Sequence, residues 1–155
     1  MYKHCFSNSE FHYNIYNNEP LDIIHYGDHK GRDLKFILST RINGEIGPVA
    51  FTNFYYESNN DIPTFVGGII PEKFNSGLGV YLNVVIFDYL FSNGIVKSIF
   101  TGVFKFNKRS YKMLKAVGFV EQENRKDSIF MLIDNEQFNN EFVNRLKKKV
   151  TYEYI

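Results

Sequence analysis

Two glycines at the start of an apolar stretch are the residues whose spacing points most directly to chemistry. Gly77 and Gly79 lie in the segment KFNSGLGVYLNVVIF, which begins at Lys73 and leads from a strand-like run into a helical pattern. The first N–H groups of a helix lack internal partners and carry partial positive charge, and glycine lets an anion approach them closely. The segment from Asn75 to Val80 therefore predicts a pyrophosphate site, although a tight packing turn uses the same glycines.

Two better-known phosphate motifs do not fit this loop. A P-loop requires Gly-Lys-Ser/Thr after its first glycine, and a dinucleotide fingerprint requires a third glycine where this chain has Leu82. The loop by itself leaves phosphate binding and packing open.

A second polar segment follows further along the chain, NKRSYKMLKAVGF, from Asn107 to Phe119. Asn107 is a predicted helix N-cap, Ser110 lies in the first turn, and Gly118 is a natural left-handed end to the helix. The basic residues of this helix are expected on its outer face: Lys108, Arg109, Lys112 and Lys115.

Composition limits the classes of protein to consider. The chain has 155 residues, a formal net charge of +1 and a single cysteine, Cys5. This length predicts one domain over residues 1–155, and the near-neutral charge argues against a nucleic-acid partner. A lone cysteine argues against a disulfide framework and favours a reducing compartment. No segment reads as a signal peptide or a membrane span, which predicts a cytoplasmic protein without membrane contact.

Hydrophobic patterns indicate the elements that must position the two polar segments. The residues before Leu34 are polar, Asn-rich and irregular, and they match no long periodic element. Beyond them the patterns predict a mixed α/β domain of strands at 34–42, 49–57 (with Pro48 at its entry), 64–71, 95–104 and 128–134, helices at 78–92, 107–119 and 136–149, and a polar turn at 121–127. An Asn-Gly turn joins the first two strands, and the many Phe and Tyr residues predict an aromatic core. Gly67 and Gly68 predict a bulge or the close approach of another group. The terminal run from Arg145 to Lys149 is expected to be a solvated helix end rather than a phosphate-binding arm.

Together, the two polar segments resemble the motifs of the GCN5-related N-acetyltransferase (GNAT) superfamily. Its members carry a Q/R-x-x-G-x-G/A loop between the fourth strand and the next helix, and an N-x-x-S/A helix that ends in K-x-G-F. The similarity extends from Leu34 to Ile133. It implies a central, mostly antiparallel sheet that splays between strands four and five and is flanked by helices. It also implies acetyl-CoA or another acyl-CoA as co-substrate, without a metal.

The resemblance also implies the residues that hold coenzyme A. Phe74 replaces the usual Gln or Arg of the loop, so a side-chain contact to the pyrophosphate is lost. Lys73 would offset this loss. Asn107 and Ser110 match the polar pair near the sulfur, and Lys108, Arg109 or Lys112 would reach the adenosine phosphate or face solvent. The implied cofactor-binding residues are Gly68, Ile69, Ile70, Lys73, Asn75, Ser76, Gly77, Leu78, Gly79, Val80, Asn107 and Ser110.

The implied reaction is direct attack of an amine on the thioester carbonyl in a ternary complex. The backbone N–H of Ile69 or Ile70 would polarise the carbonyl. Ser110 would hydrogen-bond the departing sulfur, because Leu114 stands where many members have an acidic Tyr and Tyr111 lies on another face. The strand from Thr64 contains no carboxylate, so His25 is the candidate base; a water chain or an acceptor that arrives deprotonated is the alternative.

The acceptor is the least determined part of the prediction. The compact chain and its N-x-x-S-x-x-x-L helix are similar to enzymes that acylate the amino group of nucleotide-linked sugars, and also to N-terminal acetyltransferases of ribosomal proteins. We expect the first, with Tyr55 and Tyr56 near the acceptor cleft, able to stack on a sugar or base. A non-catalytic coenzyme A-binding module is the alternative of another class, and a homodimer stays open. His25 and His29 are not expected to bind a metal, since no third ligand is evident.

Overall fold

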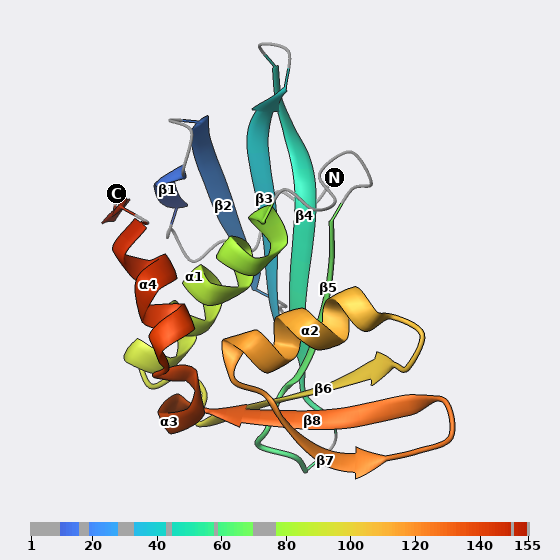
Figure 1. Cartoon of the computed structure of the whole chain (residues 1–155). Coiled ribbons are helices and arrows are strands. Elements are labelled where there is room, and N and C mark those ends of the chain that lie inside the picture. Colours follow the sequence, from blue (N-terminus) through green and yellow to red (C-terminus); the bar gives the residue numbers. More distant parts are fainter. Residues whose placement is uncertain are drawn as a thin grey trace.

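The computed structural model describes residues 10–15, 19–27, 33–42, 45–57, 59–69, 77–149 and 151–154. The described strands form one sheet in the order β7-β8-β6-β5-β4-β3-β2-β1-β9 (Figure 1). The strands are β1 (Glu10–Ile15), β2 (Glu19–Gly27), β3 (Leu34–Ile42), β4 (Glu45–Tyr55), β5 (Thr64–Ile69), β6 (Ser98–Phe104), β7 (Val120–Asn124), β8 (Ser128–Asp134) and β9 (Thr151–Tyr154). The helices are α1 (Leu78–Ser92), α2 (Lys108–Val117), α3 (Asn135–Phe138) and α4 (Glu141–Lys149).

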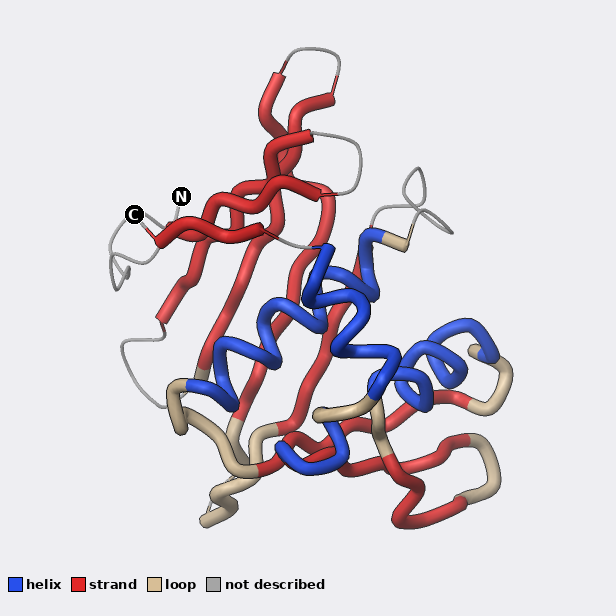
Figure 2. The backbone as a smooth tube through the Cα atoms, turned by 60° about the vertical axis from the view of Figure 1, so that its left-hand side comes forward, coloured by secondary structure: helices blue, strands red, loops and turns tan. Residues whose placement is uncertain are grey.

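The sheet is mixed and mostly antiparallel, as the family resemblance implied. Seven strand pairs are antiparallel, whereas β5 and β6 pair in parallel. The helices lie against one face of this sheet (Figure 2). The burial of β4 agrees, because Ala50, Thr52 and Phe54 are buried while Phe51 and Tyr55 on the opposite face are exposed.

The prediction of no regular element before Leu34 was wrong. The strands β1 and β2 form an antiparallel pair, β2 pairs with β3, and β9 adds to the outer edge of β1. The pairs β1–β2 and β2–β3 join strands that are consecutive in sequence, with Ile15 opposite Glu19 and Gly27 opposite Leu34, whereas β9 reaches β1 from the other end of the described chain. The partner strands supply an ordering that the polar composition of these segments did not indicate.

The hairpin of β3 and β4 forms as the Asn-Gly signal predicted, with Ile42 opposite Glu45. Pro48, however, lies within β4 rather than at its entry. The register shifts at this point, because Leu38 pairs with Ala50 while Ser39 pairs with Pro48. Proline lacks the N–H that a regular ladder needs, and a bulge accommodates it.

The core is built around an aromatic cluster, as the composition predicted. The ring of Phe87 in α1 contacts those of Phe54, Phe65, Phe119 and Phe138, with centroid separations between 5.2 and 6.1 Å. Helix α1 begins and ends where predicted, but it is buried on more than the single face that the spacing indicated. Its outer side is covered by α4, where Lys147 pairs with Asp88 of α1 at 2.7 Å.

Two elements near the C-terminal end differ from the prediction. The first part of the predicted polar turn, residues 121–124, instead belongs to β7, whose exposed side chains carry no strand signal and which forms by pairing with β8. Residues 125–127 connect the two strands, as predicted. The predicted tail helix is interrupted between α3 and α4. Asn140 causes the break: its Oδ1 accepts the N–H of Val143 at the start of α4, and its Nδ2 donates to the carbonyl oxygen of Val117.

The sheet splays between β5 and β6, which pair only at Thr64 and Phe100 before diverging. One further link follows, in which the Thr101 hydroxyl donates to the Phe65 carbonyl oxygen at 3.0 Å. Beyond it, β5 remains paired with β4 on one side through Ile69. The backbone on its other side has no strand partner among the described residues, so it borders open space.

Candidate functional site

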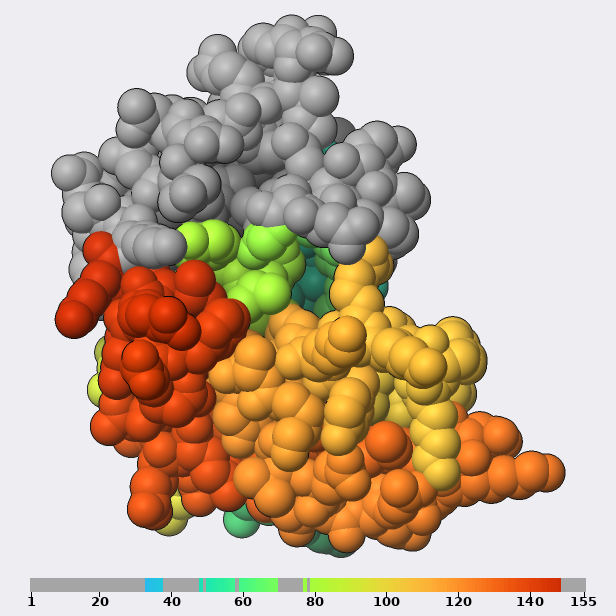
Figure 3. All heavy atoms as spheres, viewed as in Figure 1, coloured from blue at the N-terminus to red at the C-terminus, as the bar shows by residue number. Residues whose placement is uncertain are grey.

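A cavity of about 530 Å³ occupies the space between the diverging strands β5 and β6. The starts of α1 and α2 close it on the helix side, and Figure 3 shows the surface hollowed between these two helices. Its lining includes Thr52, Phe65 and Thr101 from the helix-covered face of the sheet. Phe51 and Phe104 line it from the uncovered face, so the cavity reaches both faces.

The start of α1 presents an open helix N-terminus to this cavity. Gly77 is the N-cap, with φ of 79° and no side-chain cap, and the first helical bond runs from the Tyr81 N–H to the Gly77 carbonyl oxygen. The preceding N–H groups, from Leu78 to Val80, therefore have no partner within the helix. At Gly79 a Cβ would meet nothing nearer than Ile69 Cδ1, at 4.0 Å. The amides thus border free space that an anion can enter.

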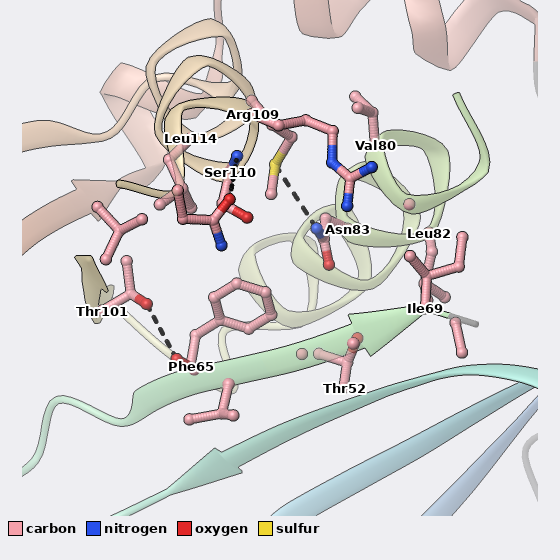
Figure 4. A pocket seen from close by; sticks show the side chains of 18 of the residues that line it. Thr52, Phe65, Ile69, Val80, Leu82, Asn83, Thr101, Arg109, Ser110 and Leu114 are labelled. Carbon is pink, nitrogen blue, oxygen red and sulfur yellow. Dashed lines mark hydrogen bonds between the residues drawn. The ribbon is translucent and has the colours of Figure 1, made fainter. Parts of the chain in front are cut away.

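Arg109 adds a positive charge at this end of the cavity. It lines the cavity from α2, and its guanidinium points towards Val80 and the first turn of α1 (Figure 4). Of the three basic residues considered for a phosphate contact, Lys108 and Lys112 are exposed and do not line the cavity. The guanidinium and the positive end of the helix dipole together favour a diphosphate here.

The other end of the cavity holds the Asn-x-x-Ser pair at the start of α2. Asn107 caps the helix as predicted, since its Oδ1 accepts the Ser110 N–H at 3.2 Å. Both residues line the cavity, and Ser110 is half-buried. Because the Asn107 oxygen is already used by the cap, its amide N–H₂ and the Ser110 hydroxyl are the groups that a ligand would contact.

Besides Thr101, two further buried polar residues that the sequence analysis did not identify line the cavity. Thr52 is 1% exposed, and its hydroxyl has no hydrogen-bond partner in the described part of the chain. Asn83 is 6% exposed and donates from Nδ2 to Met113 Sδ at 3.6 Å, a weak acceptor. The sequence could have indicated Asn83, because a polar residue that interrupts an apolar helix is unusual. It could not have indicated Thr52, because a threonine within an alternating strand is ordinary.

Comparison with known proteins rests on structure alone. No family model matches the sequence, and a comparison with curated proteins finds no match. Among solved structures, the chain is similar to spermidine N-acetyltransferase from Vibrio cholerae in complex with CoA and spermine: TM-score 0.61, 19% identity, covering 72% of this chain and 71% of that one. It is also similar to ribosomal-protein-S5-alanine acetyltransferase from Vibrio fischeri: TM-score 0.59, 17% identity, covering 70% and 64%. A domain from Methanocaldococcus jannaschii matches with TM-score 0.58 and 19% identity, covering 68% and 69%.

The chain has the GNAT fold. The resemblance implied a splay between the strands that are fourth and fifth in the family's count. These strands correspond to β5 and β6 here, and the splay is confirmed. Of the implied cofactor-binding residues, the cavity is lined by Gly68, Ile69, Gly77, Gly79, Val80, Asn107 and Ser110.

The remaining implied residues are outside what the structure describes. Ile70, Lys73, Asn75 and Ser76 belong to the segment 70–76, and only the backbone of Leu78 is described. Their roles stay predictions.

The two glycines of β5 do not form a bulge. Residues Thr64–Ile69 keep a regular register with β4. The second expectation, a close approach, fits instead: a Cβ at Gly68 would lie 2.7 Å from the ring of Phe51, which covers this glycine on the uncovered face.

The position that carries an acidic Tyr in many GNAT members holds Leu114 here, which is buried and lines the cavity. Tyr111 does not line it. The Tyr111 hydroxyl donates a hydrogen bond to Glu121, and this bond raises the pKa of Tyr111, with smaller contributions from burial and from the negative charge of Glu121. Tyr111 is therefore a weaker acid than an ordinary tyrosine, and it lies away from the cavity.

No general base is found among the described lining residues, of which Arg109 is the only ionisable one. His25 lies in β2, opposite Phe36 of β3, which in turn faces Thr52 of β4. Two strand spacings, roughly 10 Å, thus separate its backbone from Thr52. The His25 side chain lies outside the described residues, so its role as base stays a prediction. Tyr55 and Tyr56 follow the lining part of β4 but do not line the cavity themselves.

The described residues contain neither a group of metal ligands nor a membrane-spanning helix. They include no cluster of three His, Cys, Asp or Glu residues placed to bind a metal ion. They also include no helix with the length and apolar character needed to cross a membrane.

Proposed function

We propose that this protein is an acyl-CoA-dependent N-acyltransferase, which moves an acetyl or short acyl group to a primary amine. The observation that carries the proposal is the cavity in the splay, with an open helix N-terminus at one end and the Asn-x-x-Ser pair at the other. A diphosphate at Gly79 and Arg109 would place the extended arm of coenzyme A along the unpaired side of β5. The thioester would then lie near Ser110.

In the proposed reaction, the amine nitrogen attacks the thioester carbonyl carbon, a C–N bond forms and the C–S bond breaks. A backbone N–H, that of Ile69 at the end of β5 or that of Ile70 beyond the described part of the strand, stabilises the developing oxyanion; a dipole held in place needs no reorganisation during the reaction. The Ser110 hydroxyl donates to the departing sulfur. The amine loses its proton to His25 or to water, and the thiolate leaves as coenzyme A.

For the acceptor, we propose the amino group of a nucleotide-linked amino sugar. The similar solved enzymes include one for spermidine and one for the alanine of ribosomal protein S5, so they do not favour a sugar. The charge of the site supports a different acceptor from theirs. The described lining of the cavity includes no carboxylate, the group that would pair with the charged nitrogens of a polyamine or a basic peptide.

Thermal unfolding with acetyl-CoA or free coenzyme A tests the donor site first. A ligand at a hundred times its dissociation constant adds about 2.7 kcal/mol to the free energy of unfolding. Arg109→Ala should reduce this stabilisation, whereas Lys112→Ala, which removes the same charge from an exposed position of the same helix, should not. Absence of a shift in the wild type, with either ligand, would disprove the donor site.

Release of free thiol from acetyl-CoA tests the reaction and the acceptor. A nucleotide-linked amino sugar, the free amino sugar, spermidine and a peptide with an N-terminal alanine form the panel. Thiol release that depends on the nucleotide-linked sugar supports the proposal, while preference for the peptide supports the ribosomal-protein alternative. Donor binding without thiol release for any amine would support the non-catalytic module.

A further inference from the structure

The turn that joins β6 to α2 carries two exposed aromatic side chains. Phe104 is 58% exposed and Phe106 is 81% exposed, although phenylalanine is among the residues most often buried. Their rings stack on each other, with centroids 5.3 Å apart and planes inclined by 9°. Phe106 therefore offers a flat apolar face to a further ring.

The backbone of this turn is held in place by hydrogen bonds. The Asn107 N–H donates to the Phe104 carbonyl oxygen at 2.9 Å, and the Lys108 N–H donates to the Phe106 carbonyl oxygen at 3.0 Å. A third bond links the Lys105 N–H to the Asp127 carbonyl oxygen, at 3.0 Å. The two rings thus stand on a fixed support, which lowers the entropic cost of binding a ligand upon them.

Positive charge alternates with the rings. Lys105 lies between Phe104 and Phe106 in sequence, and Lys108 follows at the first position of α2. Both lysines are exposed, and neither forms an ion pair with any residue in the described part of the chain. Aromatic faces combined with unpaired cations are the features that bind a base and its phosphate.

The ring pair is continuous with the cavity. Phe104 lines the cavity, as do Phe51 and Val66, which are 45% and 43% exposed on the same uncovered face of the sheet. A molecule whose reactive end lies in the splay can therefore extend over Phe104 and Phe106 without leaving the protein surface.

We propose that Phe104, Lys105, Phe106 and Lys108 form a nucleotide platform, on which a base stacks against Phe106 while the lysines meet its phosphate. The occupant we assign is the nucleotide of the acceptor, because the turn leads directly into Asn107 and Ser110, where the thioester would lie, whereas the coenzyme A diphosphate would lie at Gly79 and hold its adenosine at the other end of the cavity. This assignment of the occupant rests on the proposed function; the platform itself rests on the exposed rings and cations.

Direct binding of two small probes tests the platform without turnover. Adenosine 3′,5′-bisphosphate represents the donor and uridine diphosphate represents the acceptor, each titrated calorimetrically into the full chain. Phe106→Ala should weaken binding of at least one probe by about tenfold, the effect of losing one base–aromatic stack. Phe106→Tyr should retain the binding, because the flat ring remains. Lys105→Gln combined with Lys108→Gln should weaken binding and reduce its dependence on salt.

Ile95→Ala is the matched control. Ile95 is an exposed apolar residue before the start of β6, so the length of this strand, roughly 20 Å, separates it from the platform. Because Phe106 is so exposed, its replacement should leave the fold intact, which thermal unfolding will confirm. Two results would overturn the platform. In the first, Phe106→Ala binds both probes as tightly as the wild type; in the second, the wild type binds neither probe.

Kinetics identify the occupant and separate this inference from the proposed function. If adenosine occupies the platform, Phe106→Ala raises the KM for acetyl-CoA but not for S-acetylpantetheine, which lacks the nucleotide. If the acceptor occupies it, the KM for the nucleotide-linked amino sugar rises and that for the free amino sugar does not. Failure of the proposed function would give a different result, because the wild type would then release no thiol from either donor.

Discussion

Replacing Gly79 by alanine separates the two explanations of the glycine loop, because phosphate binding and packing predict different results. If Gly79 only eases a tight turn, a methyl group should disturb the protein itself. The structure argues otherwise, since a Cβ at Gly79 meets only Ile69 Cδ1, at 4.0 Å, and Gly79 lies within α1 at an unstrained φ. The same methyl group would, however, occupy the space before the free amides of the first turn.

The expected effects on stability and on donor affinity have opposite signs. Alanine in place of glycine stabilises a helix by about 0.5–1 kcal/mol, with the lower value expected in the first turn. For a chain of this size, each kcal/mol raises Tm by about 2–4 °C, so Tm should rise by roughly 1–2 °C. A methyl group that displaces a phosphate removes one charge-assisted hydrogen bond of about 1.5–3 kcal/mol. Binding of acetyl-CoA should weaken by roughly tenfold to hundredfold.

Thermal unfolding of Gly79→Ala with and without acetyl-CoA measures both effects in one experiment. Ser92→Ala, at the opposite end of α1 and away from the cavity, controls for helix propensity and should leave donor affinity unchanged. A Gly79→Ala protein that binds acetyl-CoA as tightly as the wild type would refute the phosphate site. A large fall in Tm would show instead that the glycine is needed for packing.

Three further substitutions test the site and its support. Ser110→Ala should lower kcat by about tenfold or more if the hydroxyl assists the departing thiolate. Tm should change little, because the Ser110 N–H keeps its bond to Asn107, and an unchanged kcat would exclude the role. Tyr111→Phe should leave kcat unchanged in a steady-state assay, since the hydroxyl is bonded to Glu121 outside the cavity; a large loss would reinstate Tyr111 as the acid. Gly118→Ala should destabilise the protein by about 2 kcal/mol or more, seen as a lower Tm, because Gly118 has φ of 122° and a Cβ there would lie 2.3 Å from the Gln137 carbonyl oxygen. Gly94→Ala, with φ of 65° and open space around it, should cost about half as much, and equal losses would contradict the steric argument.

The sequence predicted the parts of the site that depend on local signals. Gly77 and Gly79 before an apolar run predicted an open helix start, and Asn107 with Gly118 predicted the ends of α2. These features are local because caps and left-handed residues are chosen by a few neighbouring dihedral angles. Thr52 gave no such signal, since its place beside the cavity depends on its pairing with Gly67, a residue without a side chain to cover it.

The same distinction holds for the whole chain. Alternation, turn residues and caps were sufficient to predict the strands from β3 to β6, the helices α1 and α2, and β8, because each of these elements carries a hydrophobic period or an end signal that is contained in a few neighbouring residues. Only the tertiary structure decided the pairing of β1, β2, β7 and β9, where the partner strand supplies the hydrogen bonds. It also decided which polar groups meet in the splay. Arg109 and Gly79 lie on different helices, and the sheet that diverges beneath both brings the guanidinium to the first turn of α1.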